Sequence, residues 1–338
     1  MTRLTAGRPG RLGYVPCMFA VYAAEPSPQD PLAALRVGER PEPEVPDGWV
    51  RVGVRAASLN MHDLWTLRGV GIKADRFPMI LGCDGAGVLD DGTEVVLHSV
   101  IGDPDWSGDE TLDPGRTLLT EKHQGTFADH VVVPRRNALP KPAGLSFAEA
   151  ACMGTAWLTA YRMLFVKSGL RPGQTMLVQG ASGGVSTALV QLGRAAGYRV
   201  WVTGRTEEKR ALAESLGAHA TFESGARLPE RVDAVFETVG KATWSHSMKS
   251  LKPGGIVVIS GATSGDATGA ELQRLFFLQL RVVGSTMGTR EELGDLLAFC
   301  ALNDLRPQIG LELPMERAEE GLRSMLDGET AGKIVFTR

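Results

Sequence analysis

A glycine-rich stretch in the middle of the chain could hold the phosphates of a nucleotide. It reads "VQGASGGVSTALVQLG", with a strand-like apolar run before the glycines and helical spacing after them. Such a turn directs backbone N–H groups, at the positive end of a helix, toward a pyrophosphate. The alternative is a tight turn that binds nothing. The phosphate-binding candidates are Gly180, Ser182, Gly183, Gly184 and Val185.

Ser186 stands where such turns usually carry a further glycine, which lets helix and strand approach closely. Without this glycine, we expect the helix to lie slightly farther from the strand. Because serine is small, we expect cofactor binding to be less tight but not lost.

The next strand ends in residues that favour a phosphorylated ribose. The sequence runs "YRVWVTGRTEEKR", and Arg205 takes the place where NAD sites carry Asp or Glu. A carboxylate would repel a 2′-phosphate, whereas a guanidinium can bind it bidentately. We therefore predict NADPH as the cofactor; ordinary basic residues at a helix start are the alternative. The candidates at this strand end are Thr203, Arg205, Thr206 and Lys209.

From Thr175 onward, strand-like segments alternate with segments of helical spacing. The strands are "TMLVQG", "YRVWVTG", "VDAVFETVG", "KPGGIVVISG" and "RVVGSTMG". This alternation predicts the α/β fold class, with a parallel, doubly wound sheet. Further cofactor-binding candidates come from the later strands and the C-terminal segment: Thr238, Val239, Gly261, Ala262, Thr286, Met287 and Lys333.

The first 150 residues differ, because short alternating strands such as "WVRVGVRAASLN" and "GTFADHVVVPR" predict a β-rich domain. Residues 103–124 are polar and turn-rich, which predicts a surface loop. The strand-like end "AGKIVFTR" is expected to return to this first domain. Residues 1–17 are expected to be a poorly ordered extension, with an upstream start or a weak targeting segment as alternatives.

Composition narrows the classes of partner. The 338 residues carry a formal net charge of −3, which argues against nucleic acid or an anionic membrane. No apolar run approaches the roughly 18 residues of a membrane span. The four cysteines are scattered without a CxxC pair, so neither disulfides nor a structural zinc site is expected, and a cytoplasmic location is predicted.

With both halves considered, the chain resembles the medium-chain dehydrogenase/reductase superfamily, in its zinc-free quinone oxidoreductase-like branch. The resemblance runs from Met18 to Arg338 and rests on "AASLNMHDLWTLRG", "PMILGCDGAGVL", "GTFADHVVVP", "GTAWLTAYRML", "GASGGV", "LKPGG", "VVGSTMGTREEL" and "GETAGKIVF". It implies a GroES-like catalytic domain over residues 18–150 and 300–338, and a Rossmann NADP-binding domain over residues 151–299. It also implies a homodimer or homotetramer. Lys333 matches a recurring family position near the cleft, although a surface strand lysine is the alternative.

The departures from the zinc-dependent members are informative. Those enzymes hold the metal with a Cys, a His next to a Glu, and a second Cys. The matching positions here are Asn60, Cys83 with Asp84, and Thr155, which do not make a normal catalytic zinc set. We therefore expect no bound metal, and hydride donation to a quinone or an α,β-unsaturated carbonyl in place of alcohol oxidation.

The catalytic candidates lie around these positions. Asn60 is a candidate carbonyl donor or nicotinamide neighbour, or else a capping residue at a strand end. His62 matches the position of a proton-relay hydroxyl in the zinc enzymes, and a surface or helix-start histidine is equally possible. Asp63 is expected to fix local backbone, Thr155 to line the nicotinamide pocket, and Cys83 to be a small packed residue.

Several apolar residues are candidates for a substrate wall, although aromatic residues are more often part of the core. They are Trp65, Trp106, Phe276, Phe277 and Met287. The rival hypotheses are an alcohol/aldehyde dehydrogenase, an enoyl-thioester reductase, and an NADPH-binding sensor with little turnover. In each case the expected partner is a small molecule.

Overall fold

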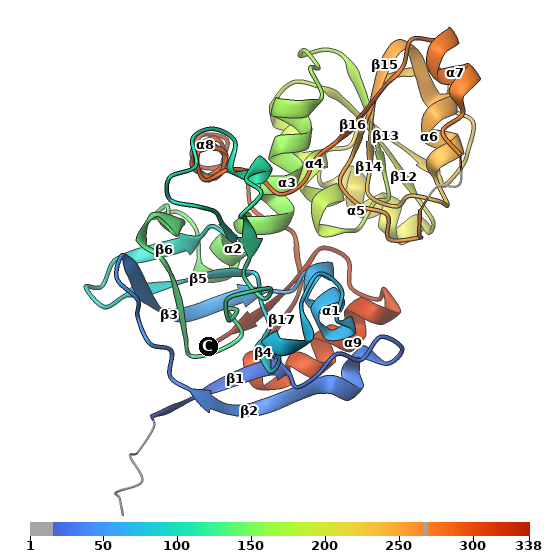
Figure 1. Ribbon diagram of the computed structural model, residues 1–338. Coiled ribbons are helices and arrows are strands. Elements are labelled where there is room, and N and C mark those ends of the chain that lie inside the picture. Colours follow the sequence, from blue (N-terminus) through green and yellow to red (C-terminus); the bar gives the residue numbers. More distant parts are fainter. Residues whose placement is uncertain (1–15, 267–268) are drawn as a thin grey trace, which may run out of the picture.

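The computed structural model describes residues 16–266 and 269–338 and has two lobes joined by a helical layer (Figure 1). Most of the predicted N-terminal extension, residues 1–15, lies outside the described residues. The first strand begins at Cys17, one residue before the predicted start.

The upper lobe in Figure 1 is the predicted Rossmann unit, a parallel six-stranded sheet in the order β13-β12-β11-β14-β15-β16. Its four inner strands are mostly apolar and largely buried on both faces, as parallel sheets require, whereas the edge strands β13 and β16 are more exposed. The strands are β11 (Thr175–Gln179), β12 (Arg199–Gly204), β13 (Ala220–Glu223), β14 (Val232–Glu237), β15 (Leu251–Ile259) and β16 (Arg281–Gly284). Its helices are α4 (Gly184–Ala195), α5 (Glu207–Ser215), α6 (Trp244–Ser250) and α7 (Leu272–Phe277).

The lower lobe is the predicted β-rich domain, built on a seven-stranded sheet in the order β10-β6-β5-β3-β18-β17, with β9 also paired to β3. The strands are β3 (Trp49–Ser58), β5 (Asp84–Leu89), β6 (Glu94–Leu97), β9 (His130–Pro134), β10 (Ala138–Pro140), β17 (Ile309–Pro314) and β18 (Lys333–Thr337). Smaller sheets contain β1 (Cys17–Ala23), β2 (Leu35–Pro41), β4 (Met79–Ile80), β7 (Val100–Ile101) and β8 (Thr117–Leu118). Helices α1 (Met61–Arg68) and α9 (Ala318–Asp327) complete this lobe.

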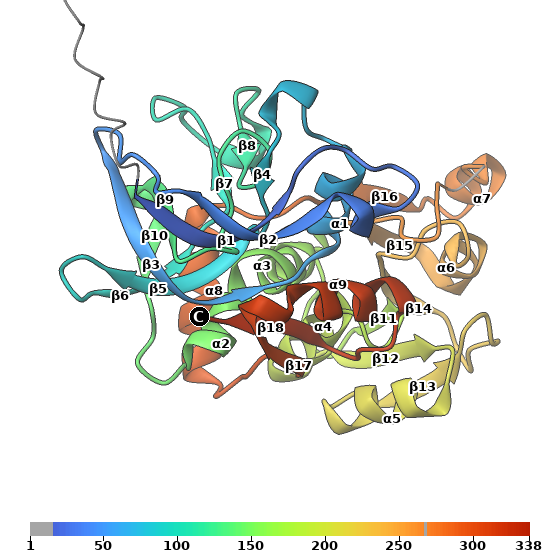
Figure 2. The ribbon, with the colours of Figure 1, turned by 90° about the horizontal axis from the view of Figure 1, so that it is seen from below.

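The C-terminal segment returns to the first domain, as predicted. β18 pairs antiparallel with β3, with Val335 opposite Ser58. Figures 1 and 2 both show the C-terminus within the β-rich lobe. The seven-stranded sheet is therefore completed by residues more than 270 positions away from β3 in the sequence.

The chain crosses between the lobes twice. The first crossing is a run of short helical pieces, α2 (Phe147–Ala151), the π-helical η5 (Met153–Trp157), α3 (Leu158–Tyr161) and the π-helical η6 (Arg162–Lys167). The second crossing is residues 285–289, which connect β16 to α8 (Arg290–Leu302).

The prediction of a plain surface loop over residues 103–124 is only partly correct. The segment contains a 3₁₀ turn, η3 (Glu110–Leu112), and the strand β8. Thr111, Asp113, Thr117 and Thr120 are buried, so this loop packs into the structure. Among residues 16–266 and 269–338, no helix combines the length and apolar character needed to cross a membrane.

Candidate functional site

The predicted cofactor residues converge at one edge of the parallel sheet. The turn after β11, the end of β12 and the segments after β14, β15 and β16 all follow the carboxyl ends of parallel strands. The strands next to β11 are β12 on one side and β14 on the other, which makes this the point where the strand order reverses. Ligands of doubly wound sheets bind at this kind of edge.

The glycine turn has the geometry of a phosphate-binding loop. Gly180 has a φ of +85°, in the region that favours glycine, and Gly183 is the N-cap of the 12-residue helix α4. Ser186 is buried, with its Oγ 3.8 Å from the position that a Cβ would take at either glycine. A Cβ at Gly193 would lie 2.6 Å from Met176 Sδ, so α4 still packs closely on β11 there. This contact lies seven residues beyond Ser186, so the expected outward shift at the start of α4 stays a prediction.

A buried polar network that sequence reasoning missed supports this edge. The Gln179 side chain, at the end of β11, accepts a hydrogen bond from Thr203 Oγ1 at 2.6 Å and donates one to Ser247 Oγ at 2.9 Å. Glu237 accepts from Ser247 Oγ at 2.6 Å and from the backbone N–H of Val239 at 2.8 Å. The network fixes the segments after β11 and β14, and Thr203 acts as its support.

The end of β12 lies against the glycine turn. A Cβ at Gly204 would come within 3.1 Å of the Ala181 Cβ, and the next residue, Arg205, is exposed. The Thr206 hydroxyl caps α5 by accepting the backbone N–H of Lys209. Lys209 Nζ donates to the carbonyl oxygen of Gly328 at 3.1 Å, so Arg205 is the better placed of the two cations for a 2′-phosphate.

On the other side of the turn, a cluster of polar side chains surrounds the carboxylate of Asp84. Ser58 Oγ donates to Asp84 Oδ2 at 2.9 Å, Asn60 Nδ2 donates to the same oxygen at 2.8 Å, and Thr155 Oγ1 donates to Oδ1 at 2.6 Å. Asn60 Nδ2 also donates to the Ser58 carbonyl at 3.2 Å. The amide protons of Asn60 are thus engaged with Asp84 and Ser58, and Asn60 is also the N-cap of α1, which agrees with the capping alternative. Its place beside the nicotinamide stays a prediction.

Lys333 completes the cluster with a positive charge. The side chain is 3% exposed, and its Nζ donates to Asn60 Oδ1 at 2.7 Å and to the carbonyl of Leu59 at 2.8 Å. Nζ also lies 3.8 Å from Asp84 Oδ2. The alkyl chain of Lys333 packs against the glycine turn at Gly184, where an added Cβ would lie 2.8 Å from Lys333 Cδ. The ammonium therefore belongs to the Asp84 cluster, and it is a buried residue, which excludes the surface alternative.

Two further candidates lie on the first turn of α1. Asp63 accepts the backbone N–H of Asn60 at 2.9 Å and of Gly82 at 2.8 Å, so it fixes local backbone as expected. Burial raises the pKa of Asp63 to about 7, against the effect of these two hydrogen bonds. His62 Nε2 is buried, has no hydrogen-bond partner among the described residues, and lies 4.0 Å from Glu121 Oε1. Burial lowers the pKa of His62, partly offset by the negative charges of Glu121 and Asp84.

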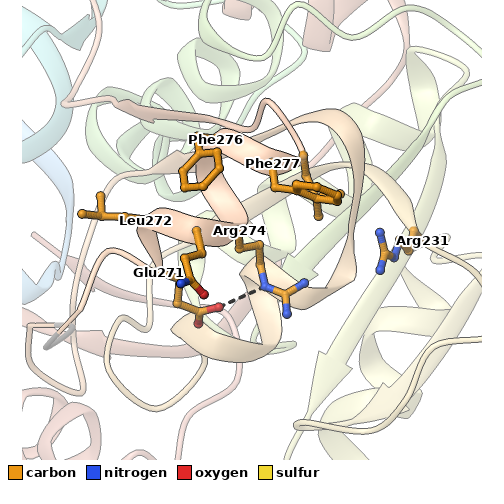
Figure 3. Close-up of a pocket in the computed structure, with 8 residues that line it drawn as sticks. Arg231, Glu271, Leu272, Arg274, Phe276 and Phe277 are labelled. Atoms are coloured by element: carbon orange, nitrogen blue, oxygen red, sulfur yellow. Dashed lines mark hydrogen bonds and ion pairs between the residues drawn. The ribbon is translucent and has the colours of Figure 1, made fainter.

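Cys83 is buried as predicted, and burial raises the pKa of its thiol, so it is a packed residue and a poor nucleophile. Phe276 and Phe277 do not belong to the site described above. They lie on α7, are 71% and 79% exposed, and line a groove with Leu272, Arg231 and the ion pair of Glu271 and Arg274 (Figure 3).

The remaining wall candidates have mixed environments. Trp65 and Trp106 are partly exposed, whereas Met287 is buried at a φ of +49° on the second crossing. Aromatic residues on a short helix give the same local signal whether they face a cleft or an outer surface. The two phenylalanines could therefore not be assigned correctly from sequence.

The comparisons with known proteins agree with this architecture. Residues 46–143 match the family described as alcohol dehydrogenase GroES-like domain, and residues 184–301 match the family described as zinc-binding dehydrogenase. A solved structure described as an NAD-dependent alcohol dehydrogenase is 33% identical, with a TM-score of 0.88, covering 95% of this chain and all of that one.

The curated relatives include proteins named as reductases and quinone oxidoreductases. The acryloyl-coenzyme A reductase of Sulfurisphaera tokodaii is 26% identical, and the quinone oxidoreductase of Lama guanicoe is 26% identical. Each alignment covers 90% of this chain and 97% of the relative.

Zinc, which one matching family's description implies, does not fit the residues present. At the positions expected to ligate it, the chain offers an amide, a thiol, a carboxylate and a hydroxyl, and Asp84 is already bonded to three side-chain donors. Within the described residues, no group of three or more His, Cys, Asp or Glu could hold a metal ion. A buried ammonium close to Asp84 further disfavours a dication at the same place.

Replacing Lys333 with methionine should leave the Asp84 carboxylate buried without its cation. Loss of one partner of a buried ion pair typically costs about 3–5 kcal/mol. We predict a loss of this size in the free energy of unfolding of Lys333→Met, measured by urea denaturation. The half-exposed Lys252, which pairs with Asp233 at 2.9 Å, provides the control Lys252→Met, with an expected loss below about 1 kcal/mol. Equal losses in the two variants would contradict the buried pair.

The raised pKa of Asp63 predicts a pH dependence of stability. The folded protein holds this proton up to about pH 7, whereas the unfolded chain releases it near the ordinary value of 3.8. The contribution to stability is therefore largest at low pH and declines as pH rises through this window, by at most about 1.4 kcal/mol per unit. In urea unfolding, the wild type should be more stable than Asp63→Asn at pH 5, and this difference in the free energy of unfolding should become smaller by pH 7. A gap that widens, or one no different from that of the exposed-site control Asp91→Asn, would contradict it.

Proposed function

Because the chain belongs to the medium-chain dehydrogenase/reductase superfamily, we propose that it is an NADPH-dependent, zinc-independent reductase that transfers a hydride to a quinone or an α,β-unsaturated carbonyl. The observation that carries the proposal is the Asp84 cluster, in which Lys333 supplies a positive charge beside the dinucleotide turn. Membership in this superfamily makes the chain an oxidoreductase; the cofactor form and the acceptor are the finer parts of the proposal.

The residues at the sheet edge fit a phosphorylated dinucleotide. The turn at Gly183 and the N-terminus of α4 would bind the pyrophosphate, and Arg205 would bind the 2′-phosphate. When bound, NADPH supplies the hydride. The related structure with 33% identity is described as NAD-dependent, so the cofactor form depends on Arg205 and not on the relationship.

The Asp84 cluster and its neighbours would hold side chains in fixed positions around the reacting groups, and they would not supply a strong acid. Thr155 is half-buried and donates its proton to Asp84, which leaves its oxygen lone pairs for a neighbouring donor. Its hydroxyl would help to line the nicotinamide end of the site. Such a site suits acceptors whose reduction spreads negative charge over a conjugated system, because its residues do not form a ligand set for a Lewis acid that would polarise an alcohol.

His62 is the proposed proton relay for the reduced product. Burial lowers its pKa, so the imidazole is neutral near pH 7 and can pass a proton from one ring nitrogen to the other. Its unpartnered Nε2, 4.0 Å from Glu121, supports this role because that carboxylate is partly exposed to solvent.

An enoyl-thioester substrate is the second candidate, since one of the relatives is an acryloyl-coenzyme A reductase. Hydride transfer to an enoyl thioester uses the same conjugated carbonyl chemistry, and the difference lies in the carrier.

Alcohol oxidation is less well supported, because the zinc ligand set is missing. A sensor role with little turnover stays an alternative prediction. The homodimer or homotetramer and the cytoplasmic location also stay predictions.

The 2′-phosphate assignment predicts the effect of one substitution. Loss of a charged hydrogen-bonding partner costs about 1.5–3 kcal/mol, so Arg205→Ala should weaken NADPH binding roughly 10- to 150-fold. NADH binding should change far less. Calorimetric titration of both cofactors measures the two effects, with Arg199→Ala, at the opposite end of β12 and paired with Glu230, as the control. Equal affinities of the wild type for NADPH and NADH would rule out the assignment.

The activity itself is tested by following NADPH consumption at 340 nm with chelator-treated protein. The acceptors are a simple benzoquinone, a simple enone and crotonyl-coenzyme A, each also tested with NADH. We expect turnover of the quinone or the enone with NADPH, unchanged by the chelator. Turnover of crotonyl-coenzyme A alone would favour the enoyl-thioester reductase over the quinone or enone reductase. Activity that requires added zinc would contradict the proposal.

A further inference from the structure

Arg162 is a buried cation that the proposed reaction does not use. It opens η6 and is 1% exposed. Its Nη1 donates to both carboxylate oxygens of Glu292, at 2.7 and 2.8 Å, and its Nη2 donates to Asp109 Oδ2. One guanidinium therefore joins two carboxylates, in the planar geometry that arginine provides and lysine does not.

The three residues come from three separate parts of the fold. Arg162 lies on the first crossing between the lobes, and Glu292 lies in the first turn of α8, directly after the second crossing. Asp109 lies in the loop between β7 and β8. In Figure 1, α8 lies beside this loop and near α3, so the three parts meet where the lobes join. We call Arg162, Asp109 and Glu292 the junction clamp.

The junction clamp holds the second crossing, residues 285–289. Glu292 also accepts the backbone N–H of Thr289 at 3.0 Å, while Thr289 Oγ1 accepts the N–H of Glu292 at 3.1 Å. The carbonyl of Gly288 lies 3.0 Å from Nε2 of the buried His98. A Cβ at Gly288 would come within 2.6 Å of Leu158, so the crossing has little room to shift.

This crossing leaves the carboxyl edge of the sheet at β16. Arg205 follows β12, on one side of β11, whereas β14, β15 and β16 lie on the other side. A dinucleotide lies across the crevice at this edge, so with its adenosine phosphate at Arg205 its nicotinamide half extends toward β14 to β16. Thr286 and Met287 are therefore at the nicotinamide end.

We propose that the junction clamp sets the position of residues 285–289, and that Arg162 is thereby a positioning residue for the nicotinamide half of the cofactor. The inference rests on the proposed cofactor site. It assigns to a buried arginine control over one half of the dinucleotide and not the other.

The test uses two probes on the full chain, NADPH and 2′,5′-ADP, which keeps the 2′-phosphate but lacks the nicotinamide. In Arg162→Met, the Kd for NADPH should rise roughly tenfold, a typical size for coupling between sites, while the Kd for 2′,5′-ADP should stay within about twofold. Asp109→Asn, which keeps the contact between Arg162 and Glu292, should shift NADPH affinity in the same direction by a smaller factor. This variant carries the test if Arg162→Met does not fold.

The matched control is Arg306→Met, which removes a more exposed arginine that also contacts two carboxylates, Glu149 and Asp304, and should change neither Kd. Equal weakening of both probes in the junction variants, or no change in either, would overturn the positioning role. Wild-type protein that binds neither probe would instead contradict the proposed cofactor site, and the positioning role with it.

Discussion

The buried pair of Lys333 and Asp84 is the interaction on which the site depends. A buried ammonium is unfavourable unless its protons find acceptors and its charge finds a partner. Lys333 meets both conditions with Leu59, Asn60 and Asp84. These residues come from β18, the start of α1 and β5, so the pair brings together the C-terminal strand, the catalytic sheet and, through Gly184, the dinucleotide turn.

This pair also limits the chemistry that the site can perform. With its charge balanced internally and its oxygens bonded to Ser58, Asn60 and Thr155, Asp84 is a poor ligand for an added cation. The protein contribution is then to position the cofactor and the acceptor, and to move a proton. The rigid polar network from Gln179 to Glu237 serves the same end on the cofactor side.

Much of this could be predicted from local sequence. The strands that flank the glycine turn, the cap at Thr206 and the return of the C-terminal strand depend on short patterns, and the structure contains all three. The junction clamp could not be predicted, because Arg162 meets partners 53 and 130 positions away, and pairing at that distance leaves no local signal. The side-chain partners of Asn60 were missed for the same reason, because Asp84 and Lys333 lie 24 and 273 positions away from it.

The most direct test of the account is native mass spectrometry of the purified chain after incubation with a molar excess of Zn²⁺ and removal of free metal. If Lys333 supplies the charge that Asp84 requires, the mass should be that of the metal-free chain. A metal-free mass is likewise expected for Cys83→Ser, because in this account the Cys83 thiol of the wild type is not a metal ligand. One tightly held zinc per wild-type chain, lost in Cys83→Ser, would contradict the account.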